Sequence, residues 1–281
     1  MNIVYLLVIV LTLSAQNITK KGYTQKSSGG VYTFSVLTCL AAALFFVLTS
    51  KGFQFEKGVV PYALAFAAAY CTTTVFSVLA ISCGSLSLTN LMISYSLMIP
   101  ALYGVFFLKE DLSAFFYPGI IMLACSLFLI NEQGEKTKVR FKWILYVVLA
   151  AVGNGMCSVF QKMQQVKFDG LYKNELMIIA LIAGALGLTV VAIIRERKEI
   201  LPCVKAGWFY AILGGVCNGI VNLFVMILSG RMSASLMFPL ISAGGIVVTY
   251  VISKYFYKEN LTRKQFIGFL LGIGSVVLLN L

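Results

Sequence analysis

Long apolar stretches follow one another along nearly the whole chain, separated by short polar gaps. A hydrocarbon core about 30 Å thick takes about 20 helical residues per crossing. Of the 281 residues, 60% are hydrophobic and 11% charged, which leaves little for a soluble domain. We therefore predict an all-α membrane protein of ten transmembrane helices, over residues 2–18, 31–49, 59–81, 86–108, 115–130, 143–161, 175–194, 206–228, 233–254 and 265–281.

One short polar segment occurs twice. The residues Phe107–Ser113 read FLKEDLS, and Phe256–Thr262 read FYKENLT. Each copy precedes an apolar stretch in which a glycine and a serine recur at the same offset, Gly119 and Ser126 in the first copy. We predict two five-helix halves, 1–135 and 136–281. Because five is odd, the halves would insert in opposite senses, as inverted repeats do.

The charge and cysteine patterns exclude several classes of function. The net charge of +12 is dispersed in short runs between apolar stretches, so it favours anchoring at the lipid surface over binding of nucleic acid. The seven cysteines show no C-x-x-C spacing and histidine is absent, which argues against a metal site. We predict no catalytic residues, no metal and no cofactor.

The repeated Lys-Glu-(Asp/Asn)-Leu-(Ser/Thr) motif, at 109–113 and 258–262, stands before the glycine-bearing last helix of each half. In this arrangement the chain resembles the EamA-like branch of the drug/metabolite transporter superfamily. The resemblance implies a carrier of small organic solutes across the cytoplasmic membrane, often by export, through a cavity shared by the halves. One departure concerns mechanism: small multidrug members rely on a carboxylate in the first helix, and Met1–Ile18 contains none.

The orientation in the membrane is left open. Lys and Arg are more numerous in the gaps after odd-numbered predicted helices, which would place both termini outside the cytoplasm. The family resemblance implies the opposite.

Polar side chains within the predicted helices are the candidates for a solute site, because burying them in lipid without a partner is unfavourable. Asparagines are favoured over Ser and Thr, whose hydroxyls commonly bond to their own helix. Asn218 and Asn222 form the strongest pair; the alternative is an interhelical hydrogen bond that only holds the bundle together. The predicted substrate-binding residues are Gln16, Tyr70, Thr73, Asn90, Tyr95, Asn154, Asn218, Asn222 and Ser242.

The predicted cavity carries no charge. None of the ten acidic residues falls near the middle of a predicted helix. An isolated buried charge costs several kcal/mol, so we expect a solute that is neutral or carries balanced charges, with amino acids as the first class to test.

Pro100 and Pro239 lie inside predicted helices, where each removes a backbone hydrogen bond and permits bending. We interpret them as hinges. The sequence thus predicts a secondary transporter whose partners are a small-molecule solute and the bilayer. The alternatives are a passive channel, a membrane assembly subunit, or an interfacial transferase.

Overall fold

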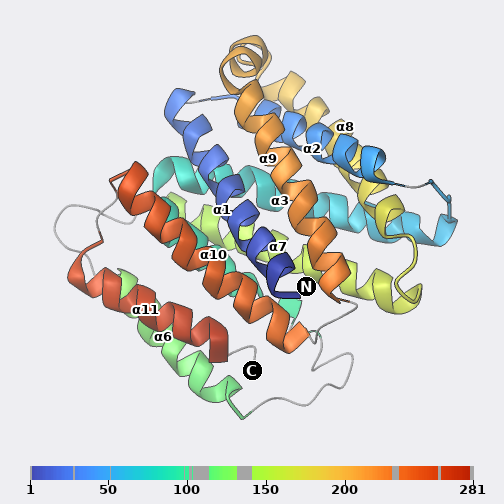
Figure 1. Ribbon diagram of the computed structural model, residues 1–281. Coiled ribbons are helices and arrows are strands. Elements are labelled where there is room, and N and C mark those ends of the chain that lie inside the picture. The colour runs from blue at the N-terminus through green and yellow to red at the C-terminus, as the bar shows by residue number, and fades with distance from the viewer. Residues whose placement is uncertain are drawn as a thin grey trace.

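The computed structural model describes residues 2–27, 29–50, 52–97, 99–100, 103, 114–131, 141–229, 234–258 and 261–278. Every regular element within these ranges is helical (Figure 1). Two 3₁₀ turns, Lys57–Val59 and Tyr95–Leu97, accompany the α-helices. These are α1 (Asn2–Lys26), α2 (Val31–Thr49), α3 (Val60–Cys83), α4 (Leu86–Ser94), α6 (Phe116–Asn131), α7 (Phe141–Lys167), α8 (Lys173–Arg195), α9 (Ile200–Ser229), α10 (Ala234–Phe256) and α11 (Arg263–Leu278).

The first helix is longer than predicted. The sequence prediction ended it at residue 18 because polar residues follow, but α1 continues to Lys26. Tyr23 explains the difference, because its ring is fully buried and stacks on Phe34 of α2 at 4.1 Å between ring centroids. Lys20, which the prediction assigned to a gap, therefore lies on a packed helix.

The fourth predicted helix, 86–108, is interrupted. Helix α4 ends at Ser94 and gives way to the 3₁₀ turn Tyr95–Leu97. Pro100 follows closely, and its ring nitrogen has no hydrogen to donate to the carbonyl of Ser96, one helical turn earlier. This missing bond is a physical reason for the break.

Some predicted features lie partly or wholly outside the described residues. The first copy of the repeated motif, 107–113, and most of the predicted boundary between halves, 132–140, lie outside the described residues. The second copy is described only in part, without Glu259 and Asn260.

The outer surface of the bundle is apolar. Six described helices are long and apolar enough to cross a membrane by length and composition: α1, α2, α3 with the turn before it, α7, α8 and α9. Their outward faces expose large apolar side chains; Leu48 on α2 is 75% exposed and Ile194 on α8 is 72% exposed. A surface of this kind is stable against lipid, where helices satisfy their own backbone groups. These helices indicate a multi-pass membrane protein, and the number of ten crossings stays a prediction.

Helices from the two ends of the chain pack against each other rather than forming separate bundles. Helix α3 packs along α7 and α1 along α9; α2 contacts α9 and α3 contacts α8; α1 contacts α10 and α4 contacts α7. Helices α6 and α11 pair at one side of the molecule (Figure 1).

Glycines permit the closest of these contacts. A Cβ atom at Gly215 on α9 would lie 2.5 Å from the carbonyl oxygen of Thr38 and 3.0 Å from the backbone nitrogen of Ala42, both on α2. Gly153 on α7 meets the backbone of α3 in the same way. Small residues let membrane helices approach closely where no hydrophobic force drives them together.

We expect Gly215→Leu to destabilise the fold by about 3 kcal/mol or more, because backbone atoms of α2 cannot move aside as a side chain can. Thermal unfolding in detergent measures the change. The matched control is Gly187→Leu on α8, where an added Cβ meets nothing within 4 Å. Equal melting temperatures for the two variants would contradict the close contact.

Candidate functional site

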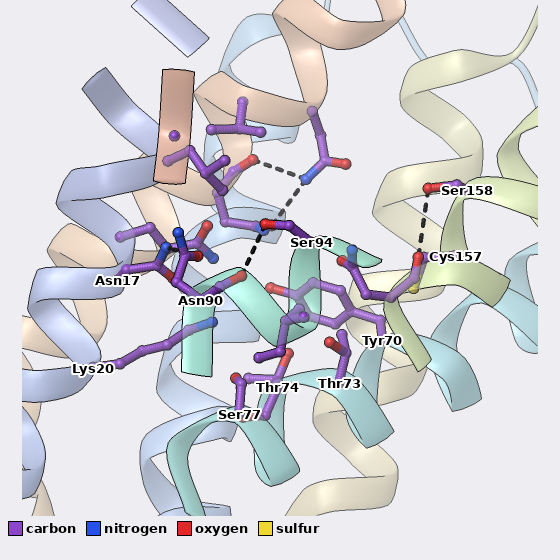
Figure 2. Close-up of a pocket in the computed structure, with 18 of the residues that line it drawn as sticks. Asn17, Lys20, Tyr70, Thr73, Thr74, Ser77, Asn90, Ser94, Cys157 and Ser158 are labelled. Atoms are coloured by element: carbon purple, nitrogen blue, oxygen red, sulfur yellow. Dashed lines mark hydrogen bonds between the residues drawn. The ribbon is translucent and has the colours of Figure 1, made fainter. Parts of the chain in front are cut away.

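A cavity of about 190 Å³ lies among α1, α3, α4, α7, α9 and α10 (Figure 2). Pockets for drug-sized ligands measure about 300–1,000 Å³, so this cavity suits a smaller solute. Amide and hydroxyl groups line it together with apolar side chains such as Leu13, Val221 and Ile241.

The structure gathers most of the predicted site residues around this one cavity. Its lining includes Gln16, Tyr70, Thr73, Asn90, Asn154, Asn218 and Asn222. These residues come from five helices that the sequence separates widely. Their role in binding a solute stays a prediction, but they share one space.

Two of the predicted substrate-binding residues, Tyr95 and Ser242, are not among the residues that line this cavity. Tyr95 lies outside the cavity: its hydroxyl is 2.9 Å from the Ser126 hydroxyl of α6, beside Gly272 of α11. The residue follows the end of α4, on a 3₁₀ turn, and so does not share the cavity-facing side of Asn90 and Ser94. The side chain of Ser242 falls outside the described residues.

A chain of amide hydrogen bonds runs along one wall. The side chain of Gln161 on α7 donates to Asn222 Oδ1 at 3.1 Å. Asn222 in turn donates to the Asn218 backbone carbonyl at 2.9 Å and to Asn218 Oδ1 at 3.2 Å. The predicted Asn218–Asn222 pair is thus a contact within α9, and Gln161 links it to α7.

Two further amide bonds hold α4 and the turn after it. Asn17 on α1 donates to Asn90 Oδ1 at 2.7 Å, and Asn154 on α7 donates to the Ser96 hydroxyl at 2.7 Å. These are interhelical bonds of the kind expected to hold a bundle together. Asn90 and Asn154 therefore both support the packing and border the cavity.

Two polar groups at the cavity make no hydrogen bond of normal geometry with the described residues. The Tyr70 side chain is only 5% exposed, and its hydroxyl makes no hydrogen bond of normal geometry. The Gln16 side-chain amide makes none either within the described part of the chain. Buried polar groups are usually satisfied, so both are candidates for contact with a bound molecule.

Lys20 is the functional candidate that sequence reasoning missed. It lines the cavity together with Leu13, Gln16 and Asn17. Their spacing follows one face of a helix, so extending the predicted first helix by two residues would have placed Lys20 on that face. The expectation of an uncharged cavity is wrong in this respect.

The described residues include no group of three or more His, Cys, Asp or Glu side chains arranged to hold a metal ion.

Comparisons with known proteins match this chain to one family and to a solved structure. The sequence profile of the EamA-like transporter family matches residues 141–281. Among solved structures, one crystal structure superposes with a TM-score of 0.69 at 14% sequence identity, over 98% of this chain and 94% of the other. This likeness concerns the fold alone. A search of curated protein sequences found no match. The family profile covers half of the chain, and the chain therefore belongs to the EamA-like transporter family.

Proposed function

We propose that the chain is a secondary carrier that moves a small organic metabolite across the cytoplasmic membrane, in the direction of export. The observation that carries the proposal is a cavity among apolar helices whose lining includes several amide and hydroxyl side chains. Polar groups buried within a membrane bundle are costly unless they serve packing or a ligand, and at this cavity the Gln16 side-chain amide has no partner among the described residues. The volume of about 190 Å³ favours a metabolite over a larger drug.

The carrier in this proposal consists of two inverted repeats, 1–135 and 136–281. Reciprocal packing supports it: exchanging the corresponding helices of the halves converts the α3–α7 contact into the α9–α1 contact. The same exchange relates α2–α9 to α8–α3, and α1–α10 to α7–α4. Helices α1 and α7, the first of each half, also end at opposite ends of the bundle (Figure 1).

A pair of cation–π contacts supports the same relation. Lys26, the last residue of α1, lies 5.2 Å from the centre of the Tyr210 ring on α9. Lys167, the last residue of α7, lies 5.2 Å from the centre of the Tyr62 ring on α3. Each half thus places the terminal lysine of its first helix on a tyrosine in the third helix of the other half.

In the proposed cycle, one half rocks against the other about the cavity, with Pro100 and Pro239 as hinges. The break at Tyr95–Leu97 supports bending near Pro100. Pro239 lies within the continuous helix α10, so any bend there would arise during the cycle. We expect Pro100→Ala to slow flux while leaving folding intact, and unchanged flux would count against this hinge.

Flux into proteoliposomes tests the proposal. Purified protein is screened with labelled amino acids, organic acids and neutral polar metabolites, and the flux of each is measured against concentration. A carrier gives saturable flux and counterflow from preloaded vesicles. Linear flux without counterflow would indicate a channel, and no flux in any class by folded protein would refute the transport proposal.

A further inference from the structure

We propose that the cavity binds an organic monoanion, with a carboxylate group paired to the ammonium group of Lys20. The inference rests on the proposed transport function and names the class of its substrate. It replaces the expectation of a neutral or zwitterionic solute.

Lys20 of α1 lies at the cavity. Its side chain reaches into the cavity from α1, on the same side as Asn17, while Tyr70 lies across from it on α3 (Figure 2). It makes no hydrogen bond or ion pair with any described residue. The neighbouring Lys21 differs, since its ammonium group donates to the Gly84 carbonyl at 3.5 Å.

The described lining of the cavity contains no counter-ion for the Lys20 ammonium group. No Asp or Glu occurs among the cavity residues that the structure describes. Glu196 and Glu199 accept backbone hydrogen bonds near the start of α2, and Glu175 accepts one from Gln54. An unpaired ammonium group within a membrane bundle is unfavourable, so a bound anion would relieve a cost that the empty protein carries.

Two neutral hydrogen-bond donors of the lining would surround the bound anion. The Tyr70 hydroxyl is buried beside Thr74 without a hydrogen bond of normal geometry, and the Gln16 amide is without a partner among the described residues. Both can donate hydrogen bonds to carboxylate oxygens. Hydrogen bonds with a charged partner are about twice as strong as those between neutral groups. Lys20 and these two neutral donors would together bind a carboxylate.

Charge balance selects the monoanion. One carboxylate neutralises Lys20, whereas a dianion would leave one negative charge unpaired. A zwitterionic amino acid would bring an ammonium group for which the described lining offers only amide and hydroxyl oxygens. The α9 amides in the lining, Asn218 and Asn222, suit the neutral polar part of such a molecule.

The experiment compares Lys20→Met with Lys21→Met, which removes the adjacent charge outside the cavity. Thermal unfolding of each purified protein is measured with matched carboxylate and amide pairs: lactate and lactamide, benzoate and benzamide, nicotinate and nicotinamide. Alanine serves as the zwitterion. Lys20→Arg retains the charge.

We expect at least one carboxylate to raise the apparent Tm of the wild type by about 3 °C at ten times its Kd, and its amide to have no effect. Lys20→Met should weaken this binding on the order of 100-fold. Without solute, Lys20→Met should melt higher than the wild type, because an unpaired charge has been removed. Lys21→Met should keep the carboxylate effect, and Lys20→Arg should keep part of it.

Three results would overturn the inference: no carboxylate stabilises the wild type, amides or alanine stabilise it as well as carboxylates do, or Lys20→Met responds to carboxylates as the wild type does. Saturable flux of a neutral or zwitterionic solute would then leave the transport proposal standing. The absence of any flux would remove both.

Discussion

Replacing Glu196 by leucine is expected to lower the free energy of unfolding by about 4 kcal/mol. The Glu196 side chain is 7% exposed, and its carboxylate accepts hydrogen bonds from the backbone nitrogens of Tyr32 and Thr33 at 3.0 and 2.9 Å. It also accepts one from the Thr33 hydroxyl at 2.9 Å. Without the carboxylate these donors in the first turn of α2 remain buried and unpaired, at about 1–3 kcal/mol each.

Thermal unfolding in detergent measures the effect, which corresponds to a fall in Tm of about 10 °C. The control is Glu56→Leu, because Glu56 accepts a single local bond from the Gly58 backbone nitrogen at 3.1 Å. That change should cost about 1 kcal/mol. Equal melting temperatures for the two variants would mean that the loop between α8 and α9 does not hold the start of α2.

Replacing Asn222 by leucine is expected to reduce solute flux by about 100-fold, with folding largely retained. The change removes the acceptor of the Gln161 hydrogen bond and the donor to Asn218, so the amide chain along the α7 and α9 wall is broken. Each lost hydrogen bond to a solute or between site groups is worth about 1–1.5 kcal/mol, and two together amount to about two orders of magnitude.

The measurement is the flux into proteoliposomes of whichever solute stabilises the wild-type protein. Thr189→Val is the matched control, because the Thr189 hydroxyl bonds to the Ala185 carbonyl of its own helix and does not border the cavity. Its flux should equal that of the wild type. A normal rate and half-saturation concentration for Asn222→Leu would mean that the amide chain only supports packing.

The helices were predictable because long apolar stretches leave few alternatives to membrane helices. Helix α2 begins and ends where the sequence prediction places it. The end of α1 was not predictable in the same way, since Thr19, Lys20 and Lys21 have the polarity of a loop, and the packing of Tyr23 against α2 is a tertiary contact. The break after Ser94 had a sequence signal in Pro100, because a proline removes the hydrogen bond to the carbonyl one helical turn earlier.

The site was predictable where side-chain chemistry alone indicates it. Amides such as Asn154 and Asn222 need polar partners that an apolar helix does not supply, so their presence marked the cavity wall. The prediction that Tyr95 lines the cavity was wrong, because one serine on a neighbouring helix, here Ser126, is enough to pair with its hydroxyl. Lys20 was missed because its position follows from the length of α1, which polarity alone set too short.

We expect the one cavity to open to each side of the membrane in turn during transport. Ser158 on α7 lines the cavity, and its one hydrogen-bond partner within the described part of the chain is the Asn154 carbonyl of its own helix, so Ser158→Cys is a mild change. With the native cysteines replaced, the new thiol is labelled in proteoliposomes by a membrane-impermeant methanethiosulfonate added from outside or trapped inside. The account predicts labelling from both sides without ion conductance, and labelling from one side only would contradict it.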